Sequence, residues 1–139
     1  MTNQSDFLSS ENEMIAFGET LGQTLSKTDV VFLLGNLGAG KTTLTRGILY
    51  GLGYSGPVPS PTYTLVEPYE IGGQQVYHMD LYRLKHSDEL EMLGVRDFIG
   101  SNLCLIEWPE RANEVLPNPD VTISIEPSKH GRVVKVTRC

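Results

Sequence analysis

The sequence predicts a three-layer α/β domain in which a mixed β-sheet is flanked by helices. Two wholly apolar runs, residues 30–34 and 103–106, are typical of strands buried on both faces. Helical spacing of apolar residues precedes the first run, and alternating apolar residues near 64–80 and 121–136 indicate antiparallel hairpins. The 139 residues fit one domain, 1–139, with enough chain to bury a core.

The N-terminal part is expected to form a helix, a strand and a second helix. Ser10 can cap the first helix, because Glu13 follows three residues later in a capping-box pattern. A glycine-rich loop then separates the strand at 30–34 from a helix at 41–52, which Gly53 ends. The apolar stripe of the first helix comprises Met14, Phe17, Leu21 and Leu25.

The remaining chain is expected to continue the sheet. Proline and glycine make residues 56–61 a loop. Ser87 can cap a short helix that Gly94 ends. The other expected elements are strands at 64–69 and 75–80 with a turn at Gly72 and Gly73, a strand at 103–106, a short helical piece at 112–116, and a terminal hairpin with its turn at 128–131.

Composition argues against several classes of protein. The net charge of −6 disfavours a surface that binds nucleic acid directly along its length, so any contact with RNA is expected to be local or indirect. The longest apolar run is far shorter than the roughly 20 residues needed to cross a membrane, and the polar N-terminus lacks the features of a secretion signal. Cys104 and Cys139 make neither a disulfide framework nor a zinc site. We therefore expect a cytoplasmic protein with no membrane contact.

A complete phosphate-binding motif follows the first apolar strand. Residues 35–42 match GxxxxGK[ST] between a buried strand and a helix. Glycines let the backbone approach a polyphosphate closely, and N–H groups at the helix N-terminus bind the anion. Lys41 can reach the β- and γ-phosphates, and the Thr42 hydroxyl can bind Mg²⁺. The expected nucleotide-binding residues here are Gly35, Asn36, Leu37, Gly38, Ala39, Gly40, Lys41, Thr42 and Thr43.

Two acidic residues at strand ends are candidates for the magnesium site. A P-loop needs an acidic group on a neighbouring strand to hold Mg²⁺, directly or through water. Glu107 follows the apolar run at 103–106 and is the stronger candidate, whereas Asp80 ends the strand at 75–80. One acid can hold the metal while the other orients the attacking water. Lys41, Asp80 and Glu107 form the expected catalytic set.

Other residues near these motifs have both functional and structural interpretations. His78 shares a strand face with Asp80 and can support the acidic site, although a half-buried histidine is the favoured interpretation. Trp108 can serve the site or only pack beside the proline that follows it. Without a transition-state arginine, hydrolysis should stay slow until a partner supplies one. The arginines interpreted as surface charges are Arg46, Arg83, Arg96 and Arg111.

The residues leave more than one nucleotide-binding function open. The NKxD and DxxG motifs of Ras-like GTPases are absent, which disfavours that class. A small-molecule kinase is the main alternative to an ATPase. Such kinases usually need an arginine-rich lid, whereas the arginines between residues 83 and 130 are widely spaced. A regulatory module that binds ATP without hydrolysing it is the third possibility.

Taken in order, four motifs resemble the TsaE family. They are GNLGAGKTT at 35–43, SPTYTLVEPY at 60–69, YHMDLYRL at 77–84 and LIEWPE at 105–110. The resemblance implies a P-loop NTPase-like fold and an ATPase that uses ATP and Mg²⁺. It also implies a part in making threonylcarbamoyladenosine next to the tRNA anticodon.

The resemblance further implies roles for individual residues and for a partner. Thr42 and Glu107 would bind Mg²⁺, Asp80 and Trp108 would be functionally important, and Thr62 would meet the γ-phosphate. The chain would act on the TsaB–TsaD pair without transferring the threonylcarbamoyl group itself. Its ATP hydrolysis would be weak alone, and its contact with tRNA would be indirect.

Overall fold

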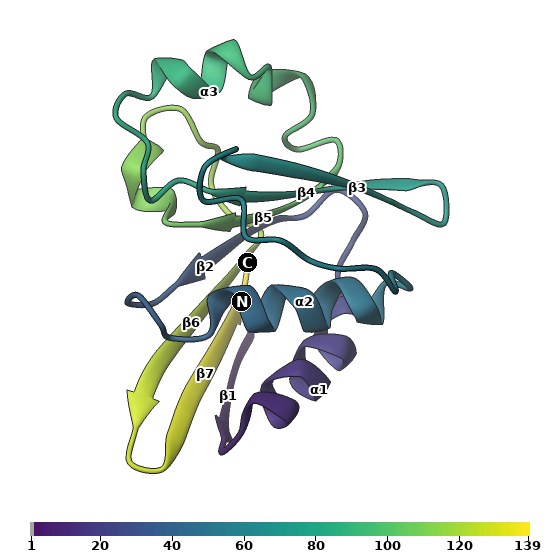
Figure 1. The fold of residues 1–139 in the computed structure, drawn as a ribbon, viewed down its shortest axis with the longest axis vertical. Coiled ribbons are helices and arrows are strands. Elements are labelled where there is room, and N and C mark those ends of the chain that lie inside the picture. Colours follow the sequence, from purple (N-terminus) through teal and green to yellow (C-terminus); the bar gives the residue numbers. More distant parts are fainter. Residues whose placement is uncertain (1) are drawn as a thin grey trace.

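The sheet has seven strands in the computed structural model, which describes residues 2–139 (Figure 1). The strands are β1 (Thr2–Leu8), β2 (Val30–Leu34), β3 (Val66–Ile71), β4 (Gln74–Asp80), β5 (Leu103–Glu107), β6 (Val121–Ser128) and β7 (Gly131–Arg138). Their order is β1-β7-β6-β2-β5-β4-β3. The four central strands are parallel, and β1, β7 and β3 pair antiparallel with their neighbours. The predicted mixed sheet is confirmed.

Helices cover both faces of this sheet. The helices α1 (Glu11–Gly22) and α2 (Lys41–Gly51) lie on one face, and α3 (Asp88–Met92) lies on the other with the short 3₁₀ helices η1 (Val95–Asp97) and η2 (Pro109–Ala112) (Figure 1). Alternate residues of β5 divide between two cores. Leu105 packs in the core that includes Ile48 of α2, whereas Ile106 packs in the core that includes Leu90 of α3. The domain therefore has the three predicted layers.

Glycines let α1 and α2 pack with their backbones in close contact. Gly18 and Gly22 of α1 face Gly47 and Gly51 of α2. A Cβ added at Gly18 would lie 2.7 Å from the Leu44 carbonyl oxygen, closer than real Cβ contacts allow. This contact sets the position of α2, whose first turn contains Lys41 and Thr42 of the GxxxxGK[ST] motif.

Most predicted elements are confirmed. The Ser10 hydroxyl caps α1 by accepting a hydrogen bond from the Glu13 N–H at 3.1 Å. The strand at 30–34 is β2, and α2 ends at Gly51, shortly before Gly53. Residues 56–61 contain no helix or strand, and both predicted hairpins are present as β3–β4 and β6–β7.

The N-terminal segment forms a strand that the sequence pattern does not predict. β1 pairs with β7 so that Thr2 lies opposite Arg138, at the edge of the sheet. Backbone hydrogen bonds hold this edge strand, and one of its side chains, Leu8, is buried. Its mostly polar sequence is therefore compatible with a strand although it shows no apolar alternation.

Several element boundaries differ from those predicted. Leu65 has a left-handed φ of 68°, so β3 begins only at Val66. Leu25 lies beyond the end of α1 but still packs against the core. The helical piece expected at 112–116 is instead η2, because Pro109 fits the first turn of a helix.

The predicted cap at Ser87 is wrong. Its side chain makes no capping hydrogen bond to α3, and its backbone is already helical. The Glu89 carboxylate accepts hydrogen bonds from the N–H groups of Lys85 and His86 instead, at 2.8 and 3.0 Å. This bonding organises the entry to α3 in place of the serine.

No helix among residues 2–139 combines the length and apolar character needed to span a lipid bilayer.

Candidate nucleotide site

A glycine-rich loop connects β2 to the N-terminus of α2. Gly38 and Gly40 have φ values of 78° and 109°, which side chains other than glycine rarely adopt. Gly40 is the N-cap of α2, and no side chain among the described residues caps this helix end. The first turn of α2 therefore offers its N–H groups to an anion, as the motif predicts.

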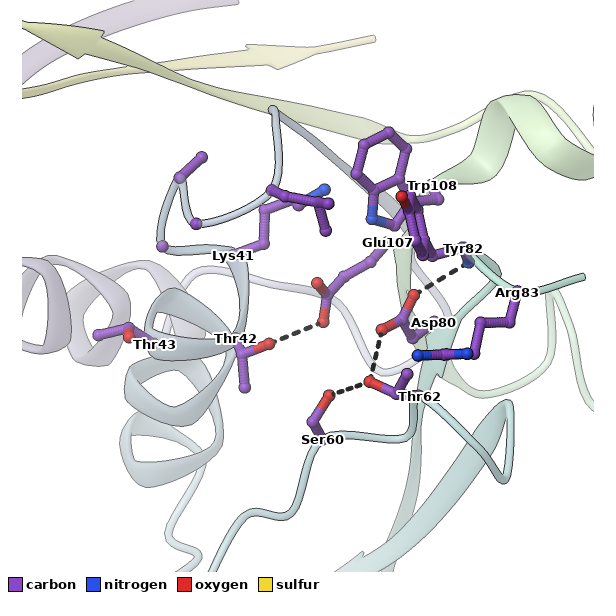
Figure 2. Close-up of a pocket in the computed structure, with 14 residues that line it drawn as sticks. Lys41, Thr42, Thr43, Ser60, Thr62, Asp80, Tyr82, Arg83, Glu107 and Trp108 are labelled. Carbon is purple, nitrogen blue, oxygen red and sulfur yellow. Dashed lines mark hydrogen bonds between the residues drawn. The ribbon is translucent and has the colours of Figure 1, made fainter.

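Asp80 and Glu107 end neighbouring parallel strands beside this loop. They are register partners on β4 and β5, and β5 lies next to β2. Both residues are buried, with exposed fractions of 7% and 3%. The Thr42 hydroxyl donates to Glu107 Oε2 at 3.4 Å (Figure 2). The sheet thus brings together both predicted acids and the predicted hydroxyl ligand.

His78 contacts the second of these acids. Its side chain is fully buried, and its Nε2 lies 2.6 Å from Glu107 Oε2. Its Nδ1 has no hydrogen-bond partner within residues 2–139. The favoured interpretation as a half-buried histidine is therefore wrong. His78 instead contacts an acid of the site, and this acid is Glu107 on the adjacent strand and not Asp80 on its own strand.

The loop at 60–62 reaches the other acid. The Thr62 hydroxyl donates to Asp80 Oδ2 at 3.4 Å, and the Ser60 and Thr62 hydroxyl oxygens lie 2.7 Å apart (Figure 2). The backbone N–H of Tyr82 donates to Asp80 Oδ1 at 3.0 Å. Both carboxylate oxygens of Asp80 therefore have partners, and Thr62 links this acid to the loop.

Lys41 lies under the ring of Trp108. Its Nζ donates to the Gly35 carbonyl at 2.6 Å and lies 3.6 Å from the centroid of the Trp108 ring. Burial lowers the pKa of Lys41, while the carboxylates of Glu107 and Asp80 oppose that shift. Trp108 has φ 58° and ψ 49°, a left-handed conformation that is uncommon for a bulky residue. The tryptophan therefore borders the pocket beside Lys41 as well as preceding Pro109, and its functional role stays a prediction.

These residues line one pocket of about 470 Å³ (Figure 2). All the predicted site residues border it except Gly35 and Asn36. Gly35 contributes its carbonyl to Lys41, and Asn36 is exposed on the loop. Thr43 borders the pocket but points away from the two carboxylates (Figure 2).

A second pocket of about 300 Å³ borders the same loop. Gly38, Ala39, Gly40 and Thr43 line both pockets. The second pocket also has walls from the end of β1, the start of α1 and the start of β7. The loop therefore separates two adjoining spaces, and the acids border only the first.

Two arginines of the site were not predicted from the sequence. Arg132 of β7 donates from Nε to the Ala39 carbonyl at 3.2 Å, and its Nη2 lies 3.5 Å from the Gly38 carbonyl oxygen. No local pattern could have indicated this contact, because it joins distant parts of the chain. Arg83 is exposed but lines the first pocket, so its interpretation as a surface charge alone is incomplete. Its place three residues after Asp80 was the available signal.

The fold and the glycine-rich loop define a P-loop NTPase-like domain, and comparisons with known proteins narrow this class. The family model described as threonylcarbamoyl adenosine biosynthesis protein TsaE matches residues 8–134. The chain belongs to the TsaE family.

Individual relatives match most of the chain. The tRNA threonylcarbamoyladenosine biosynthesis protein TsaE of Haemophilus influenzae is 46% identical over 132 residues, covering 91% of this chain and 84% of that protein. The Rickettsia bellii protein of the same name is 37% identical over 127 residues, covering 91% and 88%. The crystal structure of Bacillus subtilis YdiB superposes with a TM-score of 0.80 at 31% identity, covering 99% of this chain and 86% of that one.

Proposed function

We propose that this chain binds ATP and Mg²⁺ in the first pocket and hydrolyses ATP for the formation of threonylcarbamoyladenosine in tRNA. Family membership supports the modification pathway. The observation that carries the chemistry is the convergence of Thr42, Asp80 and Glu107 on the glycine-rich loop. In this proposal the chain acts on the TsaB–TsaD pair and does not transfer the threonylcarbamoyl group itself.

The oxygen donors of the pocket fit Mg²⁺. A hydroxyl and carboxylates are hard ligands of the kind this ion prefers, and it commonly takes only one or two of them from protein. Thr42 and Glu107 would hold the ion, and their side chains already lie 3.4 Å apart. Mg²⁺ bound there would neutralise charge on the phosphates.

The remaining residues have separate tasks in the proposed reaction. The N–H groups of the loop and of the first turn of α2 bind the phosphates, and Lys41 adds a positive charge. Asp80 orients the attacking water, which agrees with its burial and its fixed position at the end of β4. Thr62 contacts the end of the polyphosphate from the loop at 60–62, next to Asp80.

The second pocket is suited to the nucleoside. Leu8 and Met14 supply apolar walls, and the volume of about 300 Å³ leaves room for a flat ring system. Because the two pockets share the glycine-rich loop, a nucleotide could extend from one pocket to the other across it. The terminal phosphate would then lie on the side of Asp80 and Glu107.

The proposal is tested by phosphate release from Mg·ATP, measured for the chain alone and with the TsaB–TsaD pair. We expect slow release alone and faster release with the pair. Lys41→Ala and Glu107→Ala should each abolish release, while circular dichroism shows that both variants remain folded. Wild-type release from either variant would refute the role assigned to that residue.

Other outcomes would favour the two alternative functions. ATP consumption stimulated by a small phosphoryl acceptor, with a phosphorylated product, would identify a kinase. Nucleotide binding without phosphate release, with or without the pair, would identify a regulatory module. A rate of phosphate release that is the same with and without the TsaB–TsaD pair would refute the proposed partner.

A further inference from the structure

The first pocket has two cationic side chains in its walls, Lys41 and Arg83. They share the pocket with two buried acids, Asp80 and Glu107. ATP carries one more negatively charged phosphate than ADP, and the proposed binding mode places this terminal phosphate near the two acids. A cation in addition to Lys41 on that side of the pocket would offset the repulsion between the terminal phosphate and the acids.

The guanidinium of Arg83 donates no hydrogen bond to any group in the described part of the chain, residues 2–139. Within residues 2–139, Arg46, Arg96, Arg132 and Arg138 each donate to a protein oxygen, whereas Arg83 and Arg111 donate to none. Its Cζ lies 4.7 Å from the centroid of the exposed Tyr63 ring. A cation–π contact of this kind does not use the N–H groups of the guanidinium as hydrogen-bond donors to oxygen, so they are available to a ligand.

The position of Arg83 favours the terminal phosphate over the nucleoside. Its side chain extends beside Asp80 toward Thr62 (Figure 2). It lines the first pocket but not the second, which Arg132 borders instead. Tyr63 directly follows Thr62, so the ring beneath Arg83 and the Asp80–Thr62 contact belong to the same loop.

We propose that Arg83 binds the terminal phosphate of ATP and stabilises the charge that develops there during hydrolysis. This inference rests on the proposed ATPase function. In that reaction the water oxygen bonds to the γ-phosphorus, and the bond from this phosphorus to the β–γ bridging oxygen breaks. ADP leaves with the electron pair, one water proton stays on the phosphate, and the other passes to solvent. Arg83 supplies N–H donors to the transferred group throughout.

Arg111 offers a matched control. It is also exposed and also lies over a tyrosine ring, with its Cζ 5.3 Å from the Tyr82 ring centroid, and it does not line the pocket. The variants are Arg83→Gln, Arg83→Lys and Arg111→Gln. Each is titrated with ADP, with a non-hydrolysable ATP analogue and with ADP plus aluminium fluoride, all in Mg²⁺, and is assayed for phosphate release.

Arg83→Gln should lose about tenfold or more in affinity for the ATP analogue, while its affinity for ADP stays within about twofold. The loss for ADP with aluminium fluoride should be larger still, and release should fall by about 10³-fold, the lower range for a transition-state arginine. Arg83→Lys should fall between Arg83→Gln and wild type, because it keeps the charge but not the planar fork. Arg111→Gln should match wild type in every assay.

Equal affinity losses for ADP and the ATP analogue, or losses no greater than those of Arg111→Gln, would overturn the inference. The binding assays decide this even if no phosphate is released. If wild type and Arg111→Gln bind the ATP analogue but release no phosphate, the proposed hydrolysis fails while phosphate recognition by Arg83 is still measured. If wild type binds neither nucleotide, both proposals fail together.

Discussion

Nε2 of His78 lies 2.6 Å from Oε2 of Glu107, in a pair that is almost completely buried. The same carboxylate oxygen accepts a hydrogen bond from the Thr42 hydroxyl, with the two oxygens 3.4 Å apart. The imidazole therefore fixes the orientation of the acid proposed to bind Mg²⁺. Metal-binding carboxylates are commonly oriented by hydrogen bonds of this kind, from residues that do not themselves contact the metal.

Replacing His78 should weaken Mg²⁺ binding as well as stability. In His78→Leu, Glu107 loses its shortest hydrogen bond, at a cost of about 2 kcal/mol in the free energy of unfolding. The Mg²⁺ concentration needed for half-maximal ATP binding should rise in His78→Leu. In His78→Gln, which keeps an N–H donor, this concentration should lie between those of His78→Leu and wild type. Urea unfolding and ATP titrations at several Mg²⁺ concentrations measure these effects. A stability loss with an unchanged Mg²⁺ requirement would show that the histidine serves packing alone.

Replacing Arg132 should weaken the binding of ATP and of ADP to the same extent. Its guanidinium donates to the Ala39 carbonyl at 3.2 Å, and so supports the loop that we propose binds the phosphates of either nucleotide. Arg132→Leu should therefore weaken the binding of ADP and the binding of an ATP analogue by a similar factor, about tenfold. Arg138→Leu is the control, because Arg138 lies on the same strand and donates to Thr24, away from the loop. Isothermal titration calorimetry tests the prediction, and a loss confined to one nucleotide would contradict it.

Gly18→Ala should destabilise the domain although alanine is the better helix former. The intrinsic preference favours alanine by about 1 kcal/mol in a helix interior. The new Cβ would, however, lie 2.7 Å from the Leu44 carbonyl oxygen and 2.9 Å from the Ile48 nitrogen, which forces α1 and α2 apart. We expect a net loss of about 1–3 kcal/mol in urea unfolding. Thr20→Ala, on the exposed side of α1, should show no such loss, and equal behaviour of the two variants would refute the packing argument.

The parts of the site that could be predicted from the sequence are those encoded in short segments. Lys41 and Thr42 belong to a contiguous motif whose neighbours are a strand and a helix. Asp80 and Glu107 could be found because each ends a recognisable strand. In an open sheet with parallel strands, such ends meet at one edge, so the grouping of the two acids also followed from local pattern.

The parts that could not be predicted depend on register and on distant packing. His78 meets Glu107 only because β4 and β5 pair in one register, and a shift by one residue would turn its side chain to the other face. Arg132 reaches the loop because β7 lies beyond β6 in the sheet. The contact between Gly18 and α2 likewise depends on how two helices meet. None of these relations leaves a periodic signal in the sequence.

Tyr69 should make stability fall at alkaline pH. Burial, with smaller contributions from Tyr54 and Glu67, raises the pKa of Tyr69 from its ordinary value near 10 to about 12, and its hydroxyl has no hydrogen-bond partner within residues 2–139. The unfolded chain therefore loses this proton at lower pH than the folded chain. The contribution of Tyr69 to the free energy of unfolding is fully present below pH 10. This contribution is lost as the pH rises toward 12, by about 1.4 kcal/mol per pH unit. Tyr69→Phe removes this titration, so urea unfolding at pH 8 and pH 11 should show a steeper loss for wild type than for the variant. Parallel losses in the two proteins would mean that Tyr69 ionises equally easily in the folded and unfolded chains.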